Sequence, residues 1–455
     1  MVKVNNISRD DQAFTRDKST EPFKQFYNPD QSIHRFEKPR EYVRAINAAK
    51  MDDIHAKPFL DDLSGHMDTP QVIALHSKNM GYLLTGACDG EIKLWNVPSR
   101  RAVQSIKAHN SFVNGIVVDP EGEYFYSCGT DRYLKKWKLD TKTLEPEKSP
   151  VANYITDNGL LCMDHHYKQN LLVTAGDVIT VWDTTRLIPT QSFDLQMLHT
   201  METVFAVKYN KVECDIVAYC CRDRSVGLYD VRSGEVVRRL VMARKSNAVC
   251  WNPMQPFHFS LANEDSNAYT FDMRKLGDGP IMMHSGHTNA VMDIDYSPTG
   301  SEFVTGSYDK TIRIFKTDTT NYKSRELYHT RRMQRIFSVK FSSDSRFVFS
   351  GSDDHAVRIW KTNRSEPLRN MSIKEEKTLQ YNKKLVERYK HMEEVRRIDQ
   401  RRHVPKLVLK DAKILQDKRE ASDRRQRNQE KYAMKKGSKI EKPVAMKKHF
   451  LREEE

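Results

Sequence analysis

The sequence predicts an all-β fold, a seven-bladed β-propeller, followed by a basic α-helical C-terminal extension. Two observations predict the propeller: one pattern recurs seven times, and each copy alternates apolar and polar residues around a turn. A third predicts the extension, because nearly all of the net positive charge follows the last copy. Of the 455 residues, 38% are hydrophobic and 30% are charged, so we expect a core together with an unusually polar remainder.

The repeated pattern is clearest in the segments TGACDGEIKLWN, SCGTDRYLKKWK, TGSYDKTIRIFK and SGSDDHAVRIWK. Each copy ends in an aromatic residue, at intervals of 42 to 47 residues. These aromatic residues are Trp95, Trp137, Trp182, Tyr229, Phe271, Phe315 and Trp360. In six copies an aspartate stands six residues earlier, namely Asp89, Asp131, Asp223, Asp265, Asp309 and Asp354. In the third copy Asp177 is one residue closer, so that hairpin is expected to be shorter.

Each copy indicates two antiparallel strands joined by a tight turn. In residues 302–315, β-branched and aromatic residues alternate with polar ones on both sides of Asp309. An aspartate suits such a turn because its carboxylate can accept hydrogen bonds from backbone N–H groups. A unit of about 44 residues has the size of one four-stranded propeller blade. Seven blades closed into a ring would leave no exposed sheet edge.

The charge of the chain is concentrated at one end. The net charge is +14 and the isoelectric point is near 9.2. Residues 361–455 contain 29 Lys and Arg against 16 Asp and Glu, a net of +13 that leaves +1 for the first 360 residues. A neutral body with a basic tail is typical of a protein that binds a polyanion.

The basic tail, residues 363–455, also shows a helical pattern. Ser372 and Glu375 have the spacing of a capping box. The apolar residues that follow at helical spacing are Leu379, Leu385, Tyr389, Met392, Val395 and Ile398. We expect this helix to lay its apolar stripe on the propeller and to end at Pro405. Residues 410–450 are too polar to bury much surface, so they should form a solvated helix or stay disordered until they bind.

The N-terminal extension, residues 1–56, is expected to hold a short helix near residues 40–50, and the propeller to span residues 57–362. The extension lacks the apolar segment of a signal peptide, and no run of about 18 apolar residues predicts a membrane span. The seven cysteines form no C-x-x-C pair, so we expect core residues in a reducing compartment and no metal site.

No sequence motif predicts catalysis. Phosphate-binding glycine loops, nucleophile elbows and H-E-x-x-H zinc motifs are all missing from the sequence. We therefore expect neither an enzyme nor a cofactor, and no small-molecule substrate.

The repeats resemble the WD40 family, in which an upstream histidine, a Ser or Thr, the turn aspartate and the aromatic residue form a structural hydrogen-bonded set. The resemblance implies this scaffold role for His66, Thr85, Asp89 and Trp95, and for His287, Thr305 and Asp309 with Phe315 replacing the tryptophan. His109 and His329 also precede copies of the repeat. A catalytic role is disfavoured because no nucleophile accompanies the recurring His and Asp. By the same resemblance, residues 57–63 should be the outer strand of blade seven and close the ring.

The flanks carry a closer resemblance. FEKPREYVRAINAAK and AKPFL before the first copy, with RRIDQRRHVPK after the last, resemble the SOF family of nucleolar WD-repeat proteins. This resemblance implies a non-catalytic scaffold in the nucleus and nucleolus. Its partners would be the U3 small nucleolar ribonucleoprotein, pre-ribosomal RNA and other proteins of the small-subunit processome, the particle that processes 18S RNA for the 40S subunit.

Two basic sets are candidate contacts with such a particle. The tail set is Arg396, Arg397, Arg401, Arg402, His403 and Lys406, with its first four arginines expected on one broad helical face. The propeller set is Arg132, Arg222 and Arg224 beside turn aspartates, with Arg331, Arg332 and Arg335 in a loop that is longer than its counterparts. Arginine can bind phosphates with two hydrogen bonds and can stack on unpaired bases. A solvated basic surface is the alternative in both cases, and an acidic protein is an alternative partner for the tail.

A second function is suggested by YDVR (229–232) and FDMR (271–274) in consecutive blades. An aromatic-Asp-x-Arg motif resembles the one by which WD proteins dock on the DDB adaptor of cullin-RING ubiquitin ligases. The resemblance implies contacts through Arg232 and Arg274, oriented by Asp230 and Asp272. The protein would then be a substrate receptor. A free propeller that binds modified peptides through its central face is a third possibility.

Overall fold

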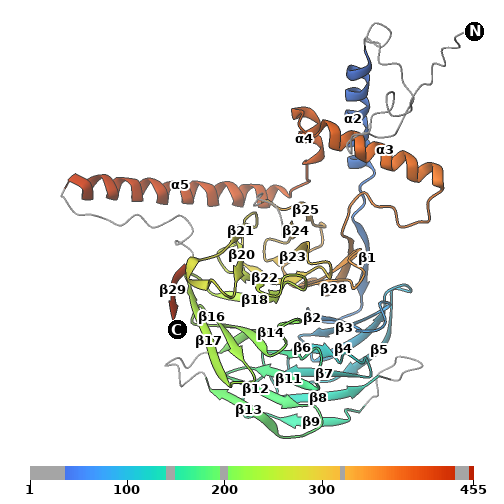
Figure 1. Cartoon of the computed structure of the whole chain (residues 1–455). Coiled ribbons are helices and arrows are strands. Elements are labelled where there is room, and N and C mark those ends of the chain that lie inside the picture. Colours follow the sequence, from blue (N-terminus) through green and yellow to red (C-terminus); the bar gives the residue numbers. More distant parts are fainter. Residues whose placement is uncertain (1–35, 140–148, 195–202, 318–322, 436–449, 455) are drawn as a thin grey trace, which may run out of the picture. The chain divides into compact units, whose positions relative to one another are not determined.

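The structure, a computed structural model, describes residues 36–139, 149–194, 203–317, 323–435 and 450–454. The strands of the structure form seven antiparallel sheets, which are arranged as the blades of a propeller (Figure 1). The predicted seven-bladed fold is therefore confirmed. Each blade contains four strands that lie side by side from the centre outwards, and one blade carries a fifth strand.

The strands follow the repeat in chain order. Blades one to three contain β2 (Pro70–Leu75), β3 (Tyr82–Ala87), β4 (Glu91–Asn96) and β5 (Arg101–Lys107); β6 (Val113–Val118), β7 (Tyr124–Gly129), β8 (Tyr133–Lys138) and β9 (Ala152–Ile155); and β10 (Cys162–His165), β11 (Leu171–Ala175), β12 (Val178–Asp183) and β13 (Pro189–Asp194). Blades four and five contain β14 (Val204–Tyr209), β15 (Ile216–Cys221), β16 (Ser225–Asp230) and β17 (Glu235–Met242); and β18 (Ser246–Trp251), β19 (His258–Asn263), β20 (Ala268–Asp272) and β21 (Met282–His284). Blades six and seven contain β22 (Val291–Tyr296), β23 (Glu302–Ser307), β24 (Ile312–Lys316) and β25 (Glu326–Tyr328); and β26 (Ile336–Phe341), β27 (Phe347–Ser352), β28 (Ala356–Lys361) and β1 (Phe59–Ser64).

The ring closes within blade seven. Strand β1 pairs antiparallel with β28, with Leu63 opposite Val357. Leu63 is fully buried and packs with Trp95 of blade one. The innermost strands also contact one another around the whole ring. Each contacts the innermost strands of both neighbouring blades, and β2 closes the circle by lying against both β6 and β26.

The core lies between neighbouring blades. The aromatic residue that ends each repeat is buried: Trp95, Phe315 and Trp360 are each 1% exposed. Glycine is required where two blades approach most closely. A Cβ on Gly86 would lie 2.6 Å from Cγ1 of Val113 in the next blade, so only glycine fits there. No disulfide is formed by the seven cysteines, all of which lie in described segments.

A separate helical unit combines the two flanks of the propeller. Helices α2 (Glu37–Ile54), α3 (Ile373–Tyr389) and α4 (Glu393–Asp399) lie together (Figure 1). They pack around a small apolar cluster. The buried residues of this cluster are Ala45, Ala48, Ala49, Leu385, Val386 and Val395. Tyr389 Oη donates a hydrogen bond to Glu41 Oε2 at 2.8 Å, and Tyr42 Oη donates one to Glu394 at 3.0 Å. The apolar stripe of the tail therefore packs on α2, and the expected contact with the propeller is corrected.

The start of the tail helix is as predicted, and its end is not. The side chain of Ser372 accepts from the backbone N–H of Glu375, whose side chain accepts from the N–H of Ser372, so the capping box is confirmed. The single helix ending at Pro405 is wrong, because extended backbone at Met392 separates α3 from α4. Pro405 precedes α5 (Lys406–Lys435), and its carbonyl accepts from Leu409 N–H at 3.1 Å. Proline suits the start of a helix because the backbone N–H groups there have no hydrogen-bond acceptor within the helix.

The last described segment is a short strand, β29 (Phe450–Glu454), which pairs with β17. None of the described helices is both long enough and apolar enough to cross a membrane.

Candidate functional site

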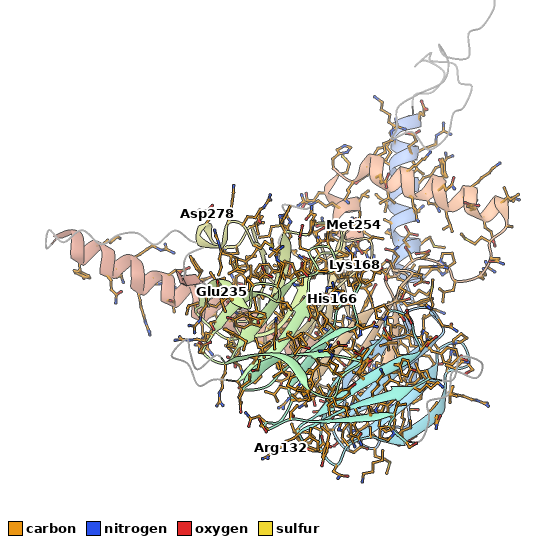
Figure 2. The ribbon with its side chains drawn as sticks, turned by 60° about the horizontal axis from the view of Figure 1, so that its bottom comes forward. Arg132, His166, Lys168, Glu235, Met254 and Asp278 are labelled. Carbon is orange, nitrogen blue, oxygen red and sulfur yellow. The ribbon has the colours of Figure 1, made fainter. Side chains whose placement is uncertain are left out.

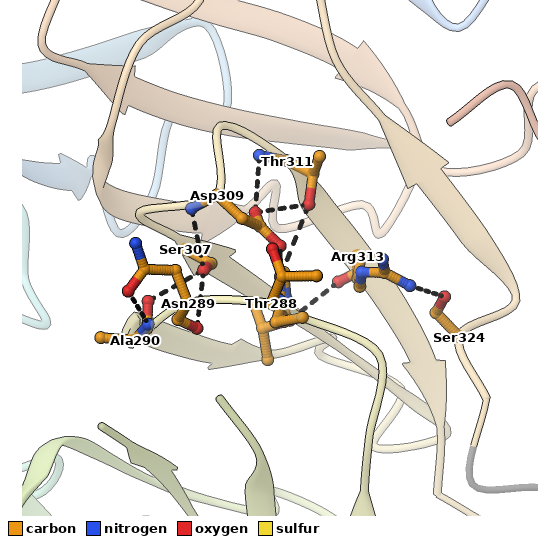
Figure 3. Close-up of polar contacts among 10 residues, drawn as sticks. Thr288, Asn289, Ala290, Ser307, Asp309, Thr311, Arg313 and Ser324 are labelled. Carbon is orange, nitrogen blue, oxygen red and sulfur yellow. Dashed lines mark hydrogen bonds and ion pairs between the residues drawn. The ribbon is translucent and has the colours of Figure 1, made fainter. Parts of the chain in front are cut away.

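One end of the propeller carries the histidine loops and the aspartate turns together. In blade six, Nδ1 of His287 lies 2.9 Å from Oδ2 of Asp309, and Nε2 lies 2.8 Å from Oγ1 of Thr305. Asp309 also accepts from the backbone N–H groups of Thr288 and Thr311 (Figure 3). A carboxylate only accepts, so the histidine proton lies on Nδ1. Phe315 supplies no indole donor, as the sequence predicts.

Burial and hydrogen bonding set the charge of this set. Burial would raise the pKa of Asp309, but His287 and Thr311 outweigh it and lower the pKa to about 2. Burial lowers the pKa of His287, against the opposing effect of Asp309. The pair therefore has the stable, water-excluded geometry of a scaffold.

Blade two holds a complete set that the sequence analysis did not assign. Trp137 Nε1 donates to Oγ of Ser127 at 3.0 Å, and that Oγ lies 2.8 Å from Nε2 of His109. Nδ1 of His109 lies 2.9 Å from Asp131 Oδ1. All four residues, His109, Ser127, Asp131 and Trp137, fit the pattern of the set, so their spacing in the sequence was the signal that could have found this blade.

Blade one departs from the predicted set. His66 Nε2 lies 2.6 Å from Oγ1 of Thr85, which accepts from Trp95 Nε1 at 2.7 Å, as expected. The carboxylate of Asp89 instead accepts from the backbone N–H of Glu91 at 2.9 Å. Nδ1 of His66 has no hydrogen-bond partner among the described residues, with Glu91 Oε2 4.0 Å away. Burial, and then Lys93, lower the pKa of His66 to about 4. The role assigned to Asp89 is corrected to that of a turn residue.

The residue after the turn aspartate has left-handed backbone in six blades. At four of these six positions the residue is basic: Arg132 (φ 66°), Arg224 (φ 71°), Lys310 (φ 65°) and His355 (φ 64°); the others are Gly90 and Ser266. Glycine adopts this backbone without strain, and another residue costs about 1 kcal/mol. All four basic side chains are exposed. Lys310 and His355 join the predicted Arg132 and Arg224, and an Asp followed by a basic residue was the signal that could have found them.

The predicted arginine loop lies in the same layer of turns. Met333 is 1% exposed and anchors the loop in the core, whereas Arg331 and Arg332 are exposed. Arg335 is also exposed, and its guanidinium lies 5.5 Å from the ring of Tyr308. Arg222 is exposed and its backbone N–H donates to Thr203 O.

These residues form what we call the turn face: Arg132, Arg222, Arg224, Lys310, Arg331, Arg332, Arg335 and His355. In every blade the second and third strands meet at this end. The opposite end carries the loops that follow the innermost strands, where His166, Lys168 and Met254 lie. Figure 2 shows these three residues well apart from Arg132.

The tail set is divided by the helix ends. Arg396 and Arg397 lie in α4 and are exposed, whereas Arg401 and Arg402 follow its last residue. Nη1 of Arg402 donates to the carbonyl of Asp399 at 2.6 Å, so this arginine caps α4. The single helical face expected for four arginines is therefore wrong, because the chain leaves the helix at Gln400.

The remaining three tail residues also lie outside α4. Arg401 and His403 are exposed, and Lys406 is the first residue of α5.

The two Asp-x-Arg motifs differ in geometry. Asp272 accepts from Nε and Nη2 of Arg274 at 3.3 and 3.2 Å, and the guanidinium stacks 4.0 Å from the ring centre of Phe257. Burial would raise the pKa of Asp272, but the hydrogen bonds from Arg274 lower it. The carboxylate of Asp230 accepts only from the backbone N–H of Arg232, at 2.9 Å, among the described contacts. The expected orientation by aspartate is therefore present at Arg274 and not at Arg232, which is exposed.

Comparisons with known proteins agree with this architecture. The Sof1-like domain family matches residues 362–449, and the WD domain, G-beta repeat, matches residues 57–96, 100–138, 279–316 and 325–361. The chain is similar to a protein of Danio rerio called DDB1- and CUL4-associated factor 13, with 41% identity over 412 residues that cover 90% of this chain and 91% of the relative. Proteins of the same name from Dictyostelium discoideum and Homo sapiens are 41% and 39% identical, each over 90% of this chain and over 91% and 90% of their own lengths.

Proposed function

The chain belongs to the Sof1-like family of WD-repeat proteins, and we propose that it is a non-catalytic scaffold of the nucleolar small-subunit processome. In this role it would associate with U3 small nucleolar RNA and pre-ribosomal RNA and serve 18S RNA processing and 40S subunit assembly. The fold alone does not decide this, because propellers serve many unrelated partners.

One observation carries the proposal: the surplus charge of +13 in residues 361–455 almost coincides with the Sof1-like segment. Exposed arginines at 396, 397 and 401 lie within it. Binding of such a segment to RNA phosphates releases counterions, which gives a strong, salt-dependent affinity. The turn face supports the same proposal, since basic residues occupy backbone positions where glycine would be less strained.

The first test is ultraviolet crosslinking of the full chain to RNA in cells, with sequencing of the bound RNA. Replacing Arg396, Arg397 and Arg401 by glutamine should reduce crosslinks to U3 and pre-ribosomal RNA by roughly tenfold, because three phosphate contacts are lost. In vitro, the slope of log affinity against log salt should become shallower by about 2 to 3.

The matched control replaces Lys78, Lys168 and Lys211 by glutamine. These exposed lysines follow the innermost strands of three blades, at the end opposite to the turn face, and the change removes the same charge. We expect crosslinks at the parent level in this variant. Equal losses of crosslinks in both variants would show that only the net charge of the chain matters. No loss of crosslinks in the tail variant would contradict RNA binding by the tail.

A second candidate function is that of a substrate receptor for a DDB-adaptor cullin-RING ligase. The names of the relatives and the ordered Arg274, held by Asp272 and Phe257, favour it. Replacing Arg232 and Arg274 by alanine in the full chain should abolish co-purification of DDB1, because the guanidinium anchors are removed.

Replacing Arg132 and Arg224 by alanine is the control, since these arginines lie on the turn face. This variant should retain DDB1 while losing part of the RNA crosslinks. Retention of DDB1 by the first variant would contradict docking through the Asp-x-Arg motifs.

A further inference from the structure

The outer edge of blade four is covered by the chain's own C-terminal segment. Strand β29 pairs antiparallel with β17, with Leu240 opposite Glu453 and Val241 opposite Arg452. Blade four is thereby the one blade among the described residues that contains five strands. The added strand comes from residues that lie more than two hundred positions after β17.

The first residue of β29 anchors it in the core. Phe450 is 7% exposed and belongs to the apolar cluster between blades four and five. Leu240, Met242 and Leu276 in this cluster are at most 1% exposed. The short helix η2 (Leu276–Asp278) of blade five lies beside β29. Backbone pairing therefore combines with a specific apolar site for an aromatic side chain, as in peptide recognition by strand addition.

Blade four has the longest outer strand among the described blades. Strand β17 has eight residues, β5 of blade one has seven, and β21 and β25 have three each. A long unpaired edge presents N–H and C=O groups to other chains and favours association. A fifth strand satisfies those groups.

We propose that the edge of β17 is a docking site for an extended segment that begins with an aromatic residue, and that Phe450–Glu454 is its resident occupant. The basic tail is then fixed to the propeller at both ends, after β28 and again at blade four. This proposal is independent of RNA binding.

Hydrogen exchange of the full chain tests the docking. In Phe450→Ala, amides of residues 238–242 should exchange roughly tenfold to a hundredfold faster than in the parent, since the anchor that keeps β29 in place is lost. The exchange of β5, the outer strand of blade one, should not change. Phe112→Ala, which removes an aromatic side chain that is 51% exposed, is the matched control and should leave β17 protected.

A second variant and a peptide make the test decisive. Arg452→Pro disrupts pairing in the middle of β29 without removing a core side chain, and it should expose β17 as Phe450→Ala does. A labelled peptide of residues 447–455 should bind either variant, bind the parent at least tenfold more weakly, and lose binding when its own phenylalanine is alanine. Unchanged exchange of β17 in both variants, or equal peptide binding by variants and parent, would overturn the proposal.

Discussion

Replacing Asp309 by alanine should destabilise the propeller by about 3–5 kcal/mol, whereas the same change at Asp89 should cost about 0.5–1.5 kcal/mol. Both residues occupy the same place in the repeat. They differ in their partners, because Asp309 contacts His287, Thr288 and Thr311, and Asp89 accepts from the backbone of Glu91. The Asp309 side chain is 1% exposed, so its removal leaves several buried donors without a partner.

Denaturant unfolding of the two full-length variants measures this difference. The effect should also depend on pH. Asp309 has a lowered pKa of about 2 in the folded chain, so its contribution is complete above the unfolded pKa near 4 and is lost as the pH falls towards 2. Equal losses of stability in both variants at pH 7 would show that turn position, and not the contacts with His287, decides the contribution.

Leu63→Ala should lower the free energy of unfolding by about 2–5 kcal/mol, because it opens a cavity in the strand that closes the ring. Leu63 is fully buried between β28 and blade one. Leu187→Ala makes the same chemical change at a side chain that is 63% exposed, and it should have an effect within about 0.5 kcal/mol.

Thermal and denaturant unfolding of both leucine variants provide the measurement. Limited proteolysis adds a local readout, since a loosened β1 should be cleaved before the other blades in Leu63→Ala. Stability equal to that of the parent would mean that the buried side chain of Leu63 does not contribute to the closure of the ring.

The propeller could be predicted because the same stabilising residues recur at regular intervals in the sequence. Each blade repeats the same turn aspartate and the same buried aromatic residue, so seven weak signals support one another. The hydrogen bonds within a repeat were less predictable. Asp89 and Asp309 are equivalent in the sequence, yet Glu91 lies close to the free nitrogen of His66 in blade one.

The flanks were harder to predict because their partners are distant in the sequence. The stripe of the tail packs on α2, and a periodic pattern identifies a buried face without naming what covers it. Pro405 could have been taken as a start or as a stop, since proline suits the first turn of a helix and terminates a preceding one. Strand β29 has the sequence FLREE, in which two apolar residues precede three charged ones, so no alternation marks it as a strand.

The helical unit also constrains the order of folding during synthesis. Tyr389 contacts Glu41, which lies 348 positions earlier in the sequence, so α2 emerges from the ribosome long before its partners exist. Pairing of β1 with β28 shortens this separation, because α2 ends just before β1 and α3 begins soon after β28. Blades can form as they are translated, but the helical unit must wait for the last blade. The helical unit can therefore form only after synthesis has reached Asp399, the last residue of α4.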